Sequence, residues 1–188
     1  MRIVGGSLSG RKISPPESIV TRPMMDRIRE NLFNILSHRD WGTGEGELFS
    51  DELYVMDAFC GTGALAFEAV SRGATKAFLF DRDQQAIKVA RQNATSLGIL
   101  GQCSIALADS TSPPVATAQC GLVFLAPPYR KGLIPPAFAA LDKAGWISPR
   151  AVIVAETAKK EEAPTLPDCE TLVSRSYGDT SLHFMKKN

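Results

Sequence analysis

Three consecutive residues, Pro127, Pro128 and Tyr129, have the groups needed to hold a flat aromatic base that carries an amine. They follow the apolar run 122–125, which is typical of a buried strand, so we expect them to form a loop at the end of that strand. A proline carbonyl can accept a hydrogen bond from an N–H group, and a tyrosine ring can stack on a base. The loop could therefore orient an exocyclic amine for attack on an electrophilic carbon.

Position 126, directly before the prolines, determines how many acceptors this loop offers. The lone pair of a conjugated amine must be freed from the ring before it can attack, and acceptors aimed at both N–H groups achieve this. The Pro127 carbonyl supplies one acceptor, but Ala126 has no polar side-chain atom to supply another. Loss of one preorganised polar group typically costs about 2.7–4 kcal/mol of transition-state stabilisation, or roughly a hundredfold to a thousandfold in rate.

A glycine-rich turn around Gly61 and Gly63 stands between an expected strand and the helix after it. Without side chains, such a turn lets a nucleoside-bearing ligand approach the backbone beyond the carboxyl end of the strand. The spacing from Gly61 to Ala66 also fits a dinucleotide-binding fingerprint, so a nicotinamide-dependent oxidoreductase is an alternative. Asp57 argues against that alternative, because its carboxylate would repel a pyrophosphate and favour a ligand that carries a positive charge.

Acidic residues also follow later strands. Asp81 ends the apolar run 77–80, and its carboxylate can accept hydrogen bonds from both hydroxyl groups of a ribose. Asp83 is close enough to take this role, and we prefer Asp81 because it ends the run directly. Asp109 stands at the end of the third strand, where we expect it beside an adenine. Together with Asp57, these acids predict a nucleoside site at the carboxyl edge of a sheet.

The order of the expected elements defines the fold class. Strands are expected at 54–58, 77–80, 104–108, 121–125 and 151–155, and helices at 65–71, 83–97 and 136–144. Strands that alternate with helices predict an α/β fold with a doubly wound, mainly parallel sheet. Residues 170–176 and 181–185 read as an antiparallel hairpin. The prediction is a seven-stranded sheet with this hairpin at one end.

The N-terminal part is expected to stand apart from this pattern. Residues 1–22 read as a basic arm or flap of short strands and glycine turns that is not part of the core, followed by the main domain at 23–188. A helix is expected to start at Thr21-Arg22-Pro23. Its apolar face contains Ile28, Leu32, Ile35 and Leu36, with Asp26, Arg27 and Arg29 on its other faces. Residues 40–52 form the only plausible linker.

Composition limits what the chain can be. With 188 residues, 44% of them hydrophobic, it can bury the core of a single compact domain. No apolar run reaches the roughly 18 residues of a membrane span, and Met1–Gly6 do not resemble a secretory signal, so a cytoplasmic location is expected. Four separated cysteines and two histidines predict no metal site.

Charge is distributed unevenly along the chain. Residues 1–40 contain seven basic and four acidic residues, a net charge of +3 in a chain whose total is +1. Such a distribution is typical of an arm that contacts phosphates, although a solvated helix face and hairpin would look the same.

These segments together resemble the bacterial family of 16S rRNA guanine-N2 methyltransferases, and the resemblance extends over essentially the whole chain. The family's opening arm is matched by Met1–Gly6 with Gly10-Arg11-Lys12. Its signature helix resembles Thr21-Arg22-Pro23 with 26–34. Residues 57–65 resemble its cofactor loop, and Ser71–Ala74 the exit of the helix after that loop.

The resemblance implies a Rossmann-like class I fold, S-adenosylmethionine as methyl donor, and the N2 amine of a guanine in 16S rRNA, guanine 966, within 30S subunits. It further implies a protein without metal or membrane contact, expected to be a monomer. The implied cofactor residues are Asp57, Phe59, Gly61, Gly63, Asp81 and Asp109. The implied target-base residues are 126–129, and the implied RNA contacts are Arg2, Arg11, Lys12, Arg22 and Arg27.

Ala126 departs from the family pattern, which has an acid before Pro-Pro-Tyr. Three explanations are open: an engineered inactivating substitution, a natural lineage with another acceptor such as Glu156 after the next strand, or an assembly factor that binds cofactor and RNA without turnover. A DNA or small-molecule amino-methyltransferase is a further alternative, because such enzymes also have Pro-Pro-Tyr after this strand.

Overall fold

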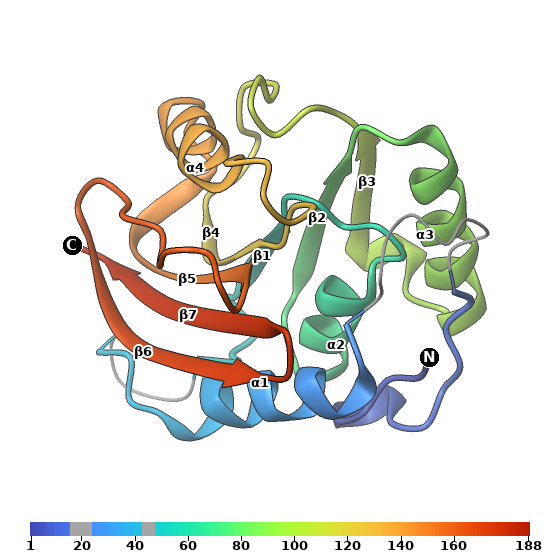
Figure 1. Ribbon diagram of the computed structural model, residues 1–188. Helices are drawn as coiled ribbons and strands as arrows, with labels where there is room; N and C mark the ends of the chain where they lie inside the picture. The colour runs from blue at the N-terminus through green and yellow to red at the C-terminus, as the bar shows by residue number, and fades with distance from the viewer. Residues whose placement is uncertain (16–23, 43–47) are drawn as a thin grey trace.

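The computed structural model describes residues 1–15, 24–42 and 48–188, which are arranged around one sheet (Figure 1). The strands are β1 (Tyr54–Asp57), β2 (Lys76–Asp81), β3 (Cys103–Leu107), β4 (Cys120–Leu125), β5 (Ile147–Ala158), β6 (Cys169–Tyr177) and β7 (Thr180–Lys187). They lie in the order β3-β2-β1-β4-β5-β7-β6. Neighbours from β3 to β5 are parallel, and β7 is antiparallel to both β5 and β6. The expected sheet, with its antiparallel hairpin at one end, is confirmed.

Helices cover both faces of this sheet. On one face lie α1 (Asp26–His38), α2 (Ala64–Ser71) and α3 (Gln84–Leu97), and on the other lies α4 (Ile134–Lys143) (Figure 1). Short 3-10 turns occur at Gly6–Leu8 and Leu100–Gln102. The expected helix positions are confirmed except for the first, because α1 begins at Asp26 with Met25 as its N-cap. The start expected at 21–23 was too early, and those three positions lie outside the described residues.

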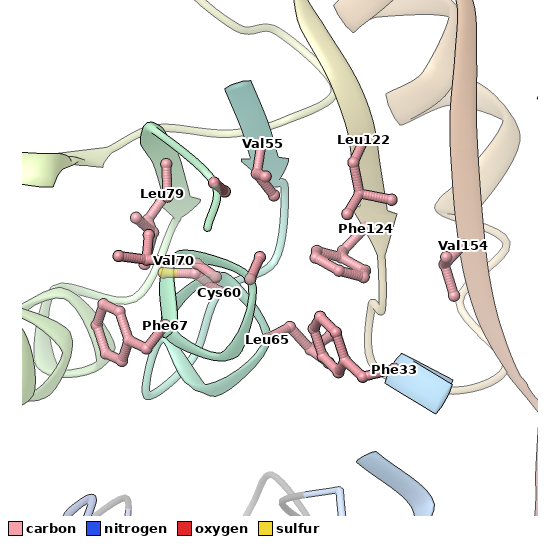
Figure 2. Close-up of a cluster of buried hydrophobic side chains, with 14 of the residues drawn as sticks. Phe33, Val55, Cys60, Leu65, Phe67, Val70, Leu79, Leu122, Phe124 and Val154 are labelled. Atoms are coloured by element: carbon pink, nitrogen blue, oxygen red, sulfur yellow. The ribbon is translucent and has the colours of Figure 1, made fainter. Parts of the chain in front are cut away.

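Alternation along the strands builds two hydrophobic cores. Val55, Leu122 and Phe124 point toward the face covered by α1, α2 and α3, as Figure 2 shows. Met56 and Val123, their neighbours in sequence, point toward α4. Since successive side chains of a strand point to opposite faces, strands buried on both sides must be apolar throughout. The continuous apolar runs in the sequence have this cause.

The N-terminal arm, residues 1–15, is part of the folded core. Ile3 and Ile13 are buried in the cluster that includes α2, and one antiparallel bridge joins Arg2 to Lys12. The hydroxyl of Ser71 on α2 donates to the Gly5 carbonyl at 2.6 Å and accepts from the Leu8 N–H at 2.9 Å. The expectation of a flap outside the core was therefore wrong. The burial of Ile3 and Ile13 and the hydrogen bonds to Ser71 fix the arm on α2.

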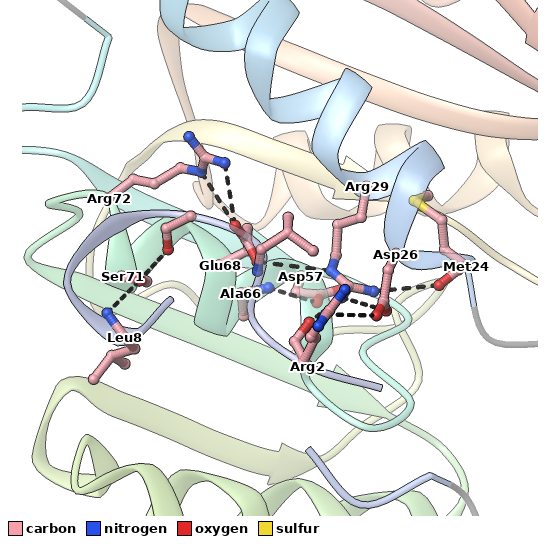
Figure 3. A network of polar contacts seen from close by, with 12 residues as sticks. Arg2, Leu8, Met24, Asp26, Arg29, Asp57, Ala66, Glu68, Ser71 and Arg72 are labelled. Atoms are coloured by element: carbon pink, nitrogen blue, oxygen red, sulfur yellow. Dashed lines mark hydrogen bonds and ion pairs between the residues drawn. The ribbon is translucent and has the colours of Figure 1, made fainter. Parts of the chain in front are cut away.

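The position of Arg29, in the same region, also differs from the expectation. The sequence pattern left it on a polar face of the helix, but its side chain is fully buried. It donates to Asp26 Oδ1 at 2.9 Å and to the Arg2 carbonyl, and its Nε lies 3.7 Å from Glu68 Oε2 (Figure 3). Glu68 lies on α2 and also accepts from the Val4 N–H at 2.9 Å. Arg29 therefore joins α1, α2 and the arm.

The described residues of the expected linker form loops that pack on the domain. Trp41 is buried, stacks on Phe184 of β7 with ring centroids 6.0 Å apart, and donates from Nε1 to the Leu36 carbonyl at 2.9 Å. Leu48 is buried as well. These contacts attach the end of α1 to the sheet.

Candidate active site

Backbone hydrogen bonds join the loops beyond the carboxyl ends of four neighbouring strands. The Cys60 N–H donates to the Phe80 carbonyl at 2.9 Å, and the Ala58 N–H donates to the Phe124 carbonyl at 3.1 Å. On the far side of β2, the Ala108 N–H donates to the Asp81 carbonyl at 2.9 Å. The segment after β1 that leads into the glycine turn is therefore held between the last residues of β2 and β4. The structure brings the expected cofactor and target-base segments to one edge of the sheet.

Asp57 lies at the end of β1 beneath the glycine turn. Its Oδ2 accepts from the Ala66 N–H at 3.3 Å, in the first turn of α2, whereas Oδ1 is buried without a hydrogen-bond partner among the described residues. Burial is the main cause that raises the pKa of Asp57 to about 7; the Ala66 N–H opposes this rise, and the nearby Asp81 carboxylate adds to it. A buried carboxylate with an unmet acceptor atom is suited to a cationic donor.

Asp81 and Asp83, which competed for one role in the sequence, have different functions in the structure. Asp81 Oδ2 accepts from the Gly61 N–H at 2.9 Å, and its Oδ1 accepts from the Asp83 N–H at 2.9 Å. Asp83 is the N-cap of α3, where its Oδ1 accepts from the Gln85 N–H at 2.8 Å. Asp81 therefore faces the glycine turn, and Asp83 stabilises a helix end.

The two glycines of the turn also differ. Both have positive φ, +51° at Gly61 and +84° at Gly63. A Cβ on Gly63 would meet the Phe67 ring at 2.2 Å, whereas a Cβ on Gly61 would meet nothing within 4 Å. Gly63 thus makes room for Phe67 of its own helix, and both glycines stay predicted cofactor residues. Gly61 borders open space.

The remaining expected cofactor residues lie at the same edge. Phe59 is half-buried and packs against the α4 cluster. Asp109 lies two residues after β3 and is exposed; the Thr111 hydroxyl, at 2.7 Å from Oδ1, is the main cause that lowers its pKa. Ser110 was not predicted from the sequence. It is buried, and its hydroxyl donates to the Ala58 carbonyl at 2.5 Å, which ties the loop after β3 to the glycine turn.

The Pro-Pro-Tyr loop leaves β4 beside the end of β5. Pro127 is buried, Pro128 is exposed, and Ala126 and Tyr129 are half-buried. The Tyr129 hydroxyl donates to Glu156 Oε1 at 2.5 Å and lies 2.8 Å from Thr180 Oγ1. Burial raises the pKa of Glu156, and the Tyr129 hydroxyl opposes that rise. The contact with Thr180 had no signal in the sequence, since β7 follows β4 by more than 50 residues.

Three of the expected RNA contacts lie on the N-terminal arm. Arg2 is exposed, with its Nε 3.6 Å from Asp26 Oδ2, and Arg11 donates to the Ser96 carbonyl of α3 at 2.6 Å. Lys12 is exposed. Arg27 is exposed on α1, and Arg22 lies outside the described residues. The described members therefore do present charge at the surface, although Arg2 and Arg11 already have protein partners.

The described ranges 1–15, 24–42 and 48–188 contain no cluster of three or more potential metal ligands, and their four cysteines are free thiols. None of the helices in the same ranges is long and apolar enough to cross a membrane.

The sheet order, the glycine turn after β1 and the acids at the strand ends define a Rossmann-like class I S-adenosylmethionine-dependent methyltransferase. Residues 1–186 match the family model described as "Conserved hypothetical protein 95". The chain is 33% identical over 171 residues to ribosomal RNA small subunit methyltransferase D of Escherichia coli, covering 89% of this chain and 79% of that one. It belongs to this family of methyltransferases.

Other RNA methyltransferases and solved methyltransferase structures are also similar to this chain. The putative rRNA methyltransferase YlbH of Bacillus subtilis is 29% identical over 193 residues, covering 100% of this chain and 99% of that protein. The solved structure of the putative methyltransferase yhhF from Escherichia coli superposes with a TM-score of 0.83 at 28% identity, covering 100% of this chain and 97% of that one. A Salinibacter ruber RNA methyltransferase in complex with S-adenosyl-L-homocysteine has the same fold, with a TM-score of 0.61 at 13% identity; 88% of this chain and 93% of that one are covered.

Proposed function

We propose that this chain transfers a methyl group from S-adenosylmethionine to the exocyclic N2 amine of a guanine in 16S rRNA, guanine 966, within 30S subunits in the cytoplasm. The observation that carries the proposal is the placement of two segments on adjacent strands: the glycine turn with Asp57 after β1, and Pro127–Tyr129 after β4. One edge of the sheet thus has a place for a cationic nucleoside cofactor and a place for a flat base with an amine. The names of the relatives support RNA as the substrate class.

The residues at the glycine turn fit this cofactor. The unmet Oδ1 of Asp57 is a buried acceptor for a donor group, and the open space at Gly61 admits a ligand against the backbone. In the proposed complex, Asp57 binds the methionine end and Asp81 the ribose hydroxyls, with Phe59 and Asp109 nearer to the adenine. When bound, the cofactor supplies an activated methyl group on a positively charged sulfur.

The target-base loop orients the amine. The Pro127 carbonyl accepts from one N–H of the guanine amine, and the Tyr129 ring stacks on the base. The structure supports this role for Tyr129, because hydrogen bonds to Glu156 and Thr180 hold its hydroxyl in place. A ring fixed at its far end has fewer orientations, which reduces the entropic cost of stacking the base on it.

The basic side chains on the arm and on α1 are proposed to bind rRNA phosphates. Such contacts place the RNA without reading its sequence. Because the arm is packed on α2, which directly follows the cofactor turn, its charges hold a fixed position relative to the site. We propose that the protein acts as a monomer and needs no metal.

Methyl transfer from radiolabelled S-adenosylmethionine to 30S subunits that lack the modification tests the proposal directly. We expect label in 16S rRNA at the N2 position of one guanine, and none in subunits already methylated there. Duplex DNA and free guanosine serve as competing substrates, and preferential labelling of either would replace rRNA as the target. Absence of incorporation by both this chain and its Ala126→Asp variant would overturn the proposal.

A further inference from the structure

Ala126, which stands where the family pattern has an acid, has an acidic neighbour on the next strand. Leu125 of β4 and Ala155 of β5 are partners in the parallel register, so Ala126 and Glu156 are the next residues along the two strands. Both are half-buried. The ends of these strands therefore place the alanine next to a carboxylate.

The side chains of these two residues belong to the same face of the sheet. Phe124 and Val154 lie two residues earlier and are both buried in the cluster beneath α1 and α2 (Figure 2). Ala126 packs against that cluster as well. Because side-chain direction repeats every second residue along a strand, Glu156 faces the side of Val154 and thus the side of Ala126.

A hydrogen bond directs the Glu156 carboxylate toward the target-base loop. Its Oε1 accepts from the Tyr129 hydroxyl, so the carboxylate reaches back to the loop that begins at Ala126. Within the described part of the chain, no donor forms a hydrogen bond with Oε2, and the side chain is not fully covered. A carboxylate can accept several hydrogen bonds, so Glu156 can hold Tyr129 with one oxygen and a second donor with the other.

We propose that Glu156 supplies the hydrogen-bond acceptor for the target amine that Ala126 cannot provide. The inference rests on the proposed function. In it, the amine donates one N–H to the Pro127 carbonyl and the other to Glu156 Oε2, while Tyr129 connects the acceptor to the stacked base. The acid comes from β5, whereas the family pattern places it directly before the prolines of the loop.

The step balances in atoms and charge. The bond between the methyl carbon and sulfur breaks, a bond between that carbon and the amine nitrogen forms, and the sulfonium becomes a neutral thioether. The nitrogen releases one proton, which the Glu156 carboxylate accepts and passes to solvent. Burial, which raises the pKa of this carboxyl group, makes it a better proton acceptor than an exposed glutamate.

The test compares single-turnover methyl transfer to unmodified 30S subunits by this chain, Glu156→Ala, Ala126→Asp and the double variant. Glu156→Ala is expected to lower the rate about a hundredfold or more. The double variant is expected to recover most of that loss, since the aspartate then stands beside Pro127. Affinity for S-adenosylhomocysteine, measured by calorimetry, is expected to remain unchanged in all four proteins. Glu162→Ala, at an exposed acid of the same type after β5, is the matched control and should keep the parent rate.

Tyr129→Phe separates two roles of Glu156: accepting a hydrogen bond from the target amine, and holding Tyr129 in position. If Glu156 only holds Tyr129, loss of the hydroxyl should cost as much as Glu156→Ala, and Ala126→Asp should rescue neither; this result would overturn the inference. A parent chain without activity beside an active Ala126→Asp variant would also overturn it; of the proposed function, the cofactor and the substrate would then stand, but not transfer by the parent chain. If none of the proteins transfers methyl groups, the proposed function fails and the inference fails with it. Glu156→Gln, which preserves side-chain size, repeats the comparison should the alanine variant be unstable.

Discussion

The guanidinium of Arg29 and the carboxylate of Glu68 form an ion pair, with Nε 3.7 Å from Oε2, in which both side chains are fully buried. Arg72 Nη2 lies 3.2 Å from the other carboxylate oxygen (Figure 3). The Val4 N–H donates to Oε2. Glu68 is thus the point where α1, α2 and the N-terminal arm meet. Burial raises the pKa of Glu68, and its donors, the Val4 N–H first, oppose that rise.

Arg29→Met should strongly destabilise the fold. Removing one partner of a buried ion pair typically costs about 3–5 kcal/mol, and Glu68 would then keep Arg72 as its cationic partner. Urea unfolding followed by circular dichroism measures the free energy of unfolding. Arg27→Met, on the exposed side of the same helix, is the control and should change it by less than about 0.5 kcal/mol. Equal values for the two variants would contradict the assigned role of the pair.

The two glycines of the cofactor turn should respond differently to alanine. Gly63→Ala forces a methyl group into the Phe67 ring and should mainly lower the free energy of unfolding, by about 1–3 kcal/mol. Gly61→Ala meets open space and should cost only the strain of a left-handed alanine, about 1 kcal/mol. Its main effect should be weaker S-adenosylhomocysteine binding, because its methyl group occupies the ligand's side of the turn. Calorimetry and thermal unfolding of both variants check this contrast. The reverse pattern would show that Gly63, and not Gly61, faces the ligand.

Asp81→Ala and Asp83→Ala form a second contrasting pair. Loss of Asp81 removes a carboxylate from the Gly61 N–H and from the proposed ribose contact, so S-adenosylhomocysteine affinity should fall at least about tenfold. Loss of Asp83 removes the N-cap of α3 and should cost about 1 kcal/mol of stability with little change in affinity. Equilibrium dialysis and urea unfolding separate these outcomes. A large affinity loss in Asp83→Ala alone would reassign the ribose contact to that residue.

Cofactor affinity should depend on the protonation of Asp57. With its pKa raised to about 7, the folded protein keeps a proton there that the unfolded chain releases near pH 4. Its ionisation therefore destabilises the fold progressively as pH rises from about 4 to 7, with no further change above that range. A cationic ligand favours the ionised form, so affinity should increase several-fold between about pH 6 and 7.5.

Asp57→Asn provides the comparison for that pH dependence. Calorimetric titration with S-adenosylmethionine across the same pH range should give a weaker and nearly flat affinity profile for this variant. The free energy of unfolding of Asp57→Asn should also lose the decline between about pH 4 and 7 that the parent shows. An unchanged affinity profile would show that another group causes the pH dependence.

Charge removal from the arm and from α1 should weaken rRNA binding in a salt-dependent manner. Log affinity decreases as log salt concentration increases. For every phosphate that a substitution leaves unpaired, this negative slope should become less steep by about 0.7–0.9. Lys12→Gln and Arg27→Gln, both at exposed side chains, should each produce this change in filter-binding titrations with 30S subunits. Lys76→Gln is the control, because Lys76 lies at the amino-terminal end of β2, opposite the site. A slope unaffected by either arm or α1 substitution would exclude a phosphate contact there.

Features that depend on neighbouring residues could be predicted from the sequence. Asp57 and Asp81 end apolar runs, and the chain must leave the sheet at such points, so their place at its carboxyl edge followed from the pattern alone. Gly98 ends α3 with φ of +77°, as a glycine after a periodic helix segment indicates. The hairpin of β6 and β7 was predicted for a similar reason, from two short runs around a turn.

Features that depend on distant partners could not be predicted in this way. The helical period placed Arg29 away from the apolar face of α1, but the arm and Glu68 cover that side of the helix. The contact between Tyr129 and Glu156 depends on β5 lying beside β4, an order of strands that a single sequence does not contain. The role of Gly63 depends on a near neighbour, Phe67, whose rotamer the sequence does not specify. In each case the role of the residue depends on another side chain, and the local sequence pattern does not specify where that side chain lies.

The position of β7 between β5 and β6 has a consequence for synthesis of the chain on the ribosome. β6 emerges before β7, yet its described pairing is with β7 alone, so it has no place on the sheet until residues 180–187 have been made. Until then, β5 presents an unpaired edge with the apolar residues Val152, Ile153 and Val154, a surface prone to join other chains. A nascent chain stalled before residue 180 should therefore need chaperone protection, whereas the parallel part of the sheet can already form.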